Sequence, residues 1–113
     1  MQTVLIVDDN NAVRAAIGRQ LRRMGLGTVE ALNGNDALHV LKIISVDLII
    51  SDGDMPGLNG RELFERIPAW LQGRFVAYTG SAELFHGADC VVIQKPDTDG
   101  LLRAVRKVLE RNT

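Results

Sequence analysis

Short apolar runs alternate along this chain with longer segments in which apolar residues recur every three or four positions. Five runs are mostly apolar, and they cover residues 4–7, 28–31, 47–51, 75–78 and 90–93. Runs of this length are typical of strands that are covered on both faces, as they are in a parallel sheet. The pattern therefore predicts five short strands.

The segments between the strands carry apolar stripes with the spacing of amphipathic helices. The first helix is expected to begin at a cap on Asn10 or Asn11 and to end at Gly25, with Arg14 off its apolar stripe. Pro68 is expected to interrupt the third helix. The four stripes consist of Val13, Ile17, Leu21 and Met24; Ala37, Leu38, Leu41 and Ile44; Leu63, Phe64 and Ile67; and Leu101, Leu102, Val105, Val108 and Leu109. This alternation predicts right-handed βαβ units and a parallel α/β sheet.

The fourth connection is shorter than the others. About ten residues, 80–89, precede the fifth strand, and only residues 81–86 have a helical pattern, which is under two turns. A parallel crossover usually needs about a dozen residues or more. We therefore expect a minimal fourth crossover, built as a single turn or an irregular loop.

Composition narrows the class of protein. The length of 113 residues corresponds to a single domain over residues 1–113, and 46% hydrophobic residues are typical of a globular chain. A net charge of −1 argues against direct binding to nucleic acid. The chain has no apolar run of roughly 18 residues and no signal peptide pattern, so we expect a cytoplasmic protein with no membrane contact. The single cysteine, Cys90, is expected to be a small core residue.

Four of the predicted strands are followed at once by a polar side chain. These side chains belong to Asp8 and Asp9, Asp52, Thr79 and Lys95. Ligands of open α/β sheets bind beyond the carboxyl ends of the strands. The sequence thus directs three carboxylates, a hydroxyl and an ammonium group to one edge of one sheet.

The types of side chain at this edge indicate phosphoryl chemistry. Neighbouring carboxylates repel one another unless a cation lies among them, and a set of oxygen ligands without His or Cys favours Mg²⁺. A carboxylate beside Mg²⁺ can attack a phosphoryl group and form an aspartyl phosphate. The Lys95 ammonium and the Thr79 hydroxyl would then supply positive charge and a hydrogen bond to the phosphoryl oxygens.

Several motifs of this chain occur in a known family, in the same order. They are the acidic pair in VLIVDD, the segment DLIISDGDMPGLNG with its D-x-x-M-P-x-x-x-G loop, the strand end FVAYTG, and the Lys-Pro of VIQKP. With these motifs the chain resembles the receiver domain of two-component response regulators from Val4 to the final helix. The resemblance implies a flavodoxin-like (βα)₅ three-layer fold, with five parallel strands in the order 2-1-3-4-5.

The resemblance also implies roles for the acidic residues. Asp52 would be the phosphoacceptor. Asp9 and Asp52 would bind Mg²⁺ through their side chains, Asp54 would bind it through its backbone carbonyl, and Asp8 would act mostly through a metal-bound water.

The remaining motif residues receive roles in the same way. Thr79 and Lys95 would contact the phosphoryl oxygens, and Gly80 would leave space for the phosphoryl group. The peptide bond between Lys95 and Pro96 is often cis in the family.

Two features depart from the family pattern. The family's switch aromatic lies three residues before the lysine, where this chain has Val92. The segment 81–86 is shorter than the family pattern by roughly six residues, more than a helical turn and a half. This loss would remove most of the fourth helix, which belongs to the surface that most receivers use to contact partners.

These observations favour a phosphoaccepting receiver that is not an enzyme in its main function. A histidine kinase or a histidine phosphotransfer protein would donate the phosphoryl group to Asp52, and an output protein or fused domain of unknown identity would respond. As a complete protein the chain would be a stand-alone regulator or phosphorelay shuttle, and as a fragment it would be part of a hybrid kinase or a larger regulator.

Two alternatives remain open from the sequence. The first is a pseudo-receiver, which would be an interaction module of the same fold that works without phosphorylation. The second is a phosphatase, because Asp52-Gly53-Asp54 resembles the D-x-D motif of haloacid-dehalogenase-type enzymes.

Overall fold

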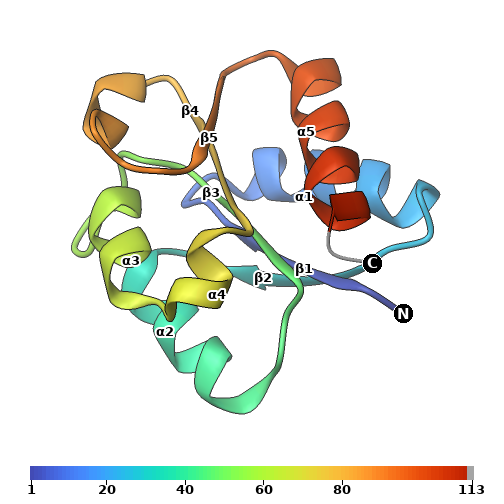
Figure 1. The fold of residues 1–113 in the computed structure, drawn as a ribbon, viewed down its shortest axis with the longest axis horizontal. Helices are drawn as coiled ribbons and strands as arrows, with labels where there is room; N and C mark the ends of the chain where they lie inside the picture. Colours follow the sequence, from blue (N-terminus) through green and yellow to red (C-terminus); the bar gives the residue numbers. More distant parts are fainter. Residues whose placement is uncertain (112–113) are drawn as a thin grey trace.

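The computed structural model describes residues 1–111 of the chain. The strands in this part form one parallel sheet of five strands in the order β2-β1-β3-β4-β5 (Figure 1). Their bounds are β1 Thr3–Val7, β2 Gly27–Ala31, β3 Leu48–Ser51, β4 Phe75–Thr79 and β5 Val91–Gln94. The predicted strand order and the parallel sheet are confirmed.

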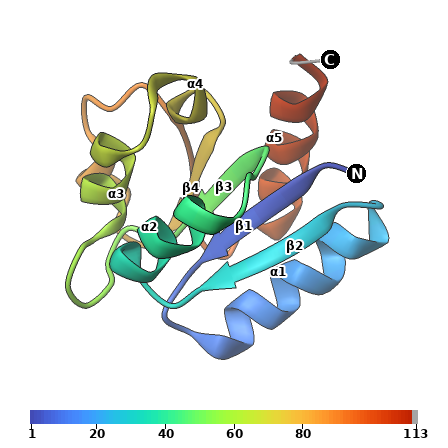
Figure 2. The same ribbon diagram turned by 90° about the horizontal axis from the view of Figure 1, so that it is seen from below.

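Helices cover both faces of the sheet, as the flavodoxin-like fold requires. The helices are α1 (Asn11–Arg23), α2 (Gly34–Ile43), α3 (Gly60–Arg66), α4 (Ala69–Gln72) and α5 (Thr98–Arg111), and one 3₁₀ turn, η1, spans Ala82–Phe85. Figure 2 shows α1 and α5 on one side of the sheet, and α2, α3 and α4 on the other. The fold therefore has three layers.

The alternation of side chains along the strands builds two apolar cores. Leu5 and Val7 of β1 point into the core under α2 and α3, whereas Val4 and Ile6 point into the core under α1 and α5. All four side chains are at most 1% exposed. Burial on both faces explains why residues 4–7 of this strand are all apolar.

Local signals fix the ends of several helices. The Asn10 side chain accepts a hydrogen bond from the Val13 N–H and caps α1, so Asn10 rather than Asn11 is the cap. Asn59 forms a capping box with Glu62 at the start of α3, which fixes where the loop after β3 turns into a helix.

Three of the predicted stripe residues lie outside their helices, and one of them, Met24, directly follows the last residue of α1. Ile67 has an extended backbone because the following Pro68 disfavours the helical conformation, and α4 begins only after this proline. Ile44 follows the last residue of α2 and is 39% exposed, so its placement on the inner helix face was wrong.

The fourth crossover is as short as predicted. Its regular part is η1, a 3₁₀ turn of four residues between β4 and β5. No helix within residues 1–111 has the length and apolar character needed to cross a membrane.

Candidate functional site

The register of the sheet brings the predicted site residues to one edge. Val7 of β1 pairs with Ser51 of β3, so Asp8 and Asp52 follow the strands side by side. Thr79 pairs with Gln94 of β5, and Lys95 follows that pair directly. The expected convergence at the carboxyl edge of the sheet is therefore present.

Three carboxylates meet at this edge. Asp8, Asp9 and Asp52 each offer an oxygen atom, and these atoms lie within 4.8 Å of one another. Asp8 is buried and Asp9 is exposed, so the group opens to solvent on one side. One Asp8 oxygen also accepts a hydrogen bond from the Asn10 N–H at 2.9 Å, which holds that carboxylate in place.

Lys95 links two of these carboxylates. Its Nζ atom lies 2.8 Å from Asp8 Oδ2 and 3.4 Å from Asp52 Oδ2. Burial lowers the pKa of Lys95, but the hydrogen bonds and negative charges of Asp8 and Asp52 outweigh it, so the pKa is raised above 10.5. The amine is consequently protonated at neutral pH and contributes a full positive charge to the site. The Lys95–Pro96 peptide is cis, as the resemblance implied.

Thr79 and Gly80 complete the rim of the site. The Thr79 side chain is fully buried, and its Oγ1 atom accepts a hydrogen bond from the Ser81 N–H at 2.9 Å. A methyl group added to Gly80 would meet no atom within 4 Å, so the chain leaves open space after Thr79. The predicted role of Gly80 in leaving space for the phosphoryl group stays a prediction.

The loop after Asp52 turns back very tightly. Asp52 Oδ1 accepts a hydrogen bond from the Gly53 N–H at 2.7 Å, and the Gly60 N–H donates to the Gly53 carbonyl at 2.8 Å. Asp54 lies exposed in this loop, and its carboxylate is not part of the acidic group. The role predicted for the Asp54 carbonyl stays a prediction.

Arg14 was expected off the apolar stripe of its helix, and the structure places it under the site. Its side chain is 8% exposed and pairs with Glu30 at 3.0 Å. The guanidinium also donates hydrogen bonds to the Asp8 carbonyl and to the Asn11 side chain. The one signal for this role in the sequence was an acidic residue, Glu30, within a predicted strand.

Cys90 lies just before β5 and is half-buried against the core under α2 and α3. Burial raises the pKa of the Cys90 thiol to about 11; Arg61 lowers it and Asp89 raises it, both by smaller amounts. The thiol is therefore protonated and unreactive at neutral pH, although Cys90 lies at the margin of the core and not inside it as expected.

The reactivity of Cys90 provides a pH test of this environment. Alkylation by iodoacetamide should accelerate about tenfold per pH unit and should not level off before about pH 11, because only the thiolate reacts. In urea the rate should level off near the ordinary thiol pKa of about 8.5. The unfolded chain loses this proton first, so ionisation of Cys90 favours unfolding between these pH values. A plateau near the ordinary value in the folded protein would contradict the burial of the thiol.

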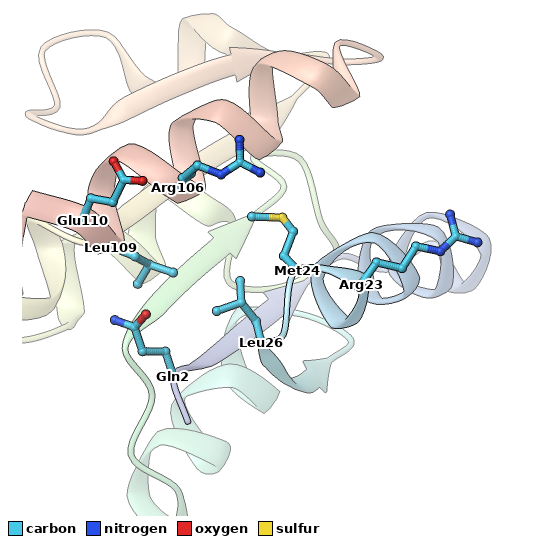
Figure 3. Close-up of a pocket in the computed structure, with 7 residues that line it drawn as sticks. All are labelled: Gln2, Arg23, Met24, Leu26, Arg106, Leu109 and Glu110. Atoms are coloured by element: carbon cyan, nitrogen blue, oxygen red, sulfur yellow. The ribbon is translucent and has the colours of Figure 1, made fainter.

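A hollow at the opposite end of the sheet is not part of this site. It lies where the last turns of α1 and α5 approach the start of β1, and Figure 3 shows Met24, Leu26 and Leu109 around it. Arg23 points away from the hollow in this view. The acidic group and the hollow thus lie at opposite ends of β1.

The fold and the acidic edge agree with comparisons to known proteins. Residues 4–108 match the family model of the response regulator receiver domain. The chain belongs to this family. Receiver domains work in two-component signalling, where they interact with histidine kinases, and they are typically not catalytic enzymes beyond the chemistry of their own phosphorylation.

Individual relatives are regulators and sensor kinases. The chain is 30% identical to the transcriptional regulatory protein AfsQ1 of Streptomyces coelicolor, over 98% of this chain and 52% of that protein. It is 43% identical to the autoinducer 1 sensor kinase/phosphatase LuxN of Vibrio harveyi, over 58% of this chain and 8% of that protein. The chain thus spans about half of one relative and a small part of the other.

Solved structures show the same fold. The response regulator TrrA of Thermotoga maritima, in complex with Mg²⁺-BeF, is 28% identical with a TM-score of 0.82, over 96% of this chain and 99% of that chain. A CheY-like receiver domain protein from Methanospirillum hungatei has a TM-score of 0.87 at 23% identity, over 98% and 95% of the two chains. The carboxylates of Asp8, Asp9 and Asp52 form the acidic triad typical of a magnesium-binding receiver site.

Proposed function

We propose that this chain is a phosphoaccepting receiver domain, with Asp52 as the phosphoacceptor. The donor is a phosphohistidine on a histidine kinase or a histidine phosphotransfer protein. A carboxylate oxygen of Asp52 forms a bond to phosphorus while the bond from phosphorus to the imidazole nitrogen breaks, and the electron pair leaves with the imidazole. The product is an aspartyl phosphate that changes which partner binds.

The observation that carries this proposal is the position of Lys95. Its ammonium group lies 3.4 Å from Asp52 Oδ2, within an acidic group that would otherwise repel an incoming phosphoryl group. The charge is in place before the reaction, so it can stabilise negative charge on the phosphoryl oxygens without reorganisation. The Thr79 hydroxyl keeps its hydrogen free to donate, because its oxygen accepts the Ser81 N–H.

The residues of the acidic group fit Mg²⁺. The donor set consists of the carboxylates of Asp8, Asp9 and Asp52, with no His or Cys among them, and such hard oxygen ligands suit this cation. We propose that Asp9 and Asp52 bind it directly, with the Asp54 carbonyl, and that Asp8 acts through a water. Bound Mg²⁺ would supply positive charge to the phosphoryl oxygens.

The proposal extends to the rest of the chain. Residues 1–113 would act as one cytoplasmic domain without direct binding to nucleic acid. Val92 stands where the family has its switch aromatic, and η1 stands where the family has a fourth helix. We therefore propose that this chain signals to its output partner in a different way from most receivers.

Intact mass after incubation with Mg²⁺ and acetyl phosphate or phosphoramidate tests this function. The wild type should gain about 80 Da, the mass of one phosphoryl adduct, and Asp52→Asn should gain none. Asp54→Asn is the matched control, because it makes the same change two residues away on an exposed side chain and keeps the backbone carbonyl. It should still gain the adduct.

Other outcomes point to the alternatives. An adduct on Asp52→Asn would exclude Asp52 as the acceptor. Mg²⁺ binding without any adduct, even with kinase as donor, would favour a pseudo-receiver. Steady release of phosphate from phosphate esters would favour the phosphatase.

A further inference from the structure

Phe85 brings an aromatic ring from the short fourth crossover to the residue that follows Asp52. Its side chain is 3% exposed and packs on Phe75 of β4, with ring centroids 6.0 Å apart. A methyl group placed on Gly53 would lie 2.9 Å from the Phe85 ring edge and 3.0 Å from Thr79 Oγ1. The Phe85 ring and the Thr79 hydroxyl thus fill the space on one side of Gly53.

The segment that carries Phe85 is held at two points. At its start, the Ser81 N–H donates to Thr79 Oγ1 at 2.9 Å. At its end, Arg61 of α3 donates from Nη1 to the carbonyls of Leu84 and His86, at 3.2 and 2.7 Å. Figure 1 shows this segment, in orange, beside α3. With these contacts a single turn keeps a defined position at the site.

The hydrogen bond from the Ser81 N–H restricts the directions in which the Thr79 hydroxyl can donate its own hydrogen. A hydroxyl group has one hydrogen to donate and accepts through its lone pairs. The Ser81 N–H occupies an acceptor position of the Thr79 oxygen, which leaves the hydrogen for another partner. The position of Ser81 depends on η1, which follows it directly and in which Phe85 is the buried residue.

We propose that Phe85 is a positioning residue for phosphoryl transfer. By packing against Gly53 and Phe75, its ring holds η1 so that Ser81 orients the Thr79 hydroxyl and the backbone after Asp52 stays in place. Arg61 supports this position from α3. The inference rests on the proposed function of Asp52 and adds a residue that touches neither metal nor phosphoryl group.

Hydrogen exchange at the Ser81 amide tests the positioning role without any phosphodonor. Phe85→Leu should increase the exchange rate of this amide about tenfold or more, because the turn loses its buried anchor. Phe64→Leu is the matched control: Phe64 packs on Phe75 with centroids 5.2 Å apart, but it is not among the atoms nearest Gly53. At equal global stability, Phe64→Leu should leave Ser81 exchange within about twofold of wild type.

Phosphorylation kinetics supply the second readout. Phe85→Leu should slow adduct formation about tenfold or more, while Mg²⁺ affinity stays within about twofold, because the carboxylates are untouched. Arg61→Gln should also slow adduct formation and leave Mg²⁺ affinity unchanged, with the apolar core intact. Arg66→Gln, on the exposed face of the same helix, should change neither the rate of adduct formation nor the Mg²⁺ affinity.

Equal Ser81 exchange in Phe85→Leu and Phe64→Leu would overturn the positioning role, whether or not the wild type is phosphorylated. Fast Ser81 exchange in Phe85→Leu would support the proposal that Phe85 holds η1 in position, even if the wild type is not phosphorylated. The absence of phosphorylation would in that case reject only the role of Asp52 as phosphoacceptor. Unchanged phosphorylation in Phe85→Leu with fast Ser81 exchange would overturn the role in transfer.

Discussion

Replacing Lys95 with methionine is expected to slow phosphoryl transfer to Asp52 about 10²- to 10³-fold, the usual cost of losing one preorganised charged donor. Mg²⁺ binding should become tighter at the same time. The ammonium lies 2.8 Å from Asp8 Oδ2 and 3.4 Å from Asp52 Oδ2, so its removal leaves more negative charge for a divalent cation. Time-resolved intact mass measures the transfer, and titration calorimetry measures Mg²⁺ binding.

The opposite signs of the two effects separate this role from a loss of folding. Lys42→Met is the matched control, since Lys42 is exposed on α2, and it should change neither quantity. Transfer at the wild-type rate in Lys95→Met would contradict the charge role. Weaker Mg²⁺ binding would show that Lys95 supports the carboxylates rather than competing with the cation.

Replacing Gly60 with alanine is expected to lower the free energy of unfolding by about 3 kcal/mol, at the upper end of the usual cost of overpacking. The added methyl group would lie 2.0 Å from the Asp52 carbonyl oxygen and 3.0 Å from the Gly53 Cα. Relief of this clash must shift the backbone that carries Asp52, so the phosphoryl adduct should also be lost. Urea denaturation and intact mass measure the two effects.

Gly73→Ala makes the same chemical change where the structure has room. The nearest atom to its methyl group is the Trp70 carbonyl oxygen at 3.8 Å, and the backbone φ of −68° suits alanine. This variant should be stabilised by about 0.4–1 kcal/mol, because alanine restricts the unfolded chain. Similar destabilisation by both substitutions would contradict the close approach of Gly60 to Asp52.

The layout of the fold could be predicted from local patterns because the apolar runs and stripes have different periods. Strands buried on both faces leave continuous apolar runs such as residues 4–7, and capping residues such as Asn10 mark helix starts. Pro68 disfavours the helical conformation of the residue before it, so the break before α4 could also be predicted from the sequence. Ile44 was misplaced because a helical stripe does not mark where its helix ends.

The acidic edge was predictable for a related reason. Parallel strands place their carboxyl ends together, so residues just after the apolar runs must converge once the topology is known. Asp8 and Asp52 needed only the pairing of Val7 with Ser51 to become neighbours. Lys95, 43 residues beyond Asp52, joins them through the order of the strands.

The amino-acid sequence by itself determined the strands, the helix starts and the set of charged groups at the sheet edge, because these follow from periodicity and capping, whereas the strand order was implied by the resemblance to receiver domains. Only the tertiary structure decided which neighbours surround that edge. Arg14 beneath Asp8, Gly60 against the Asp52 carbonyl and Phe85 against Gly53 come from different elements. Contacts of this kind depend on how the layers pack in three dimensions, and no spacing along the chain encodes them.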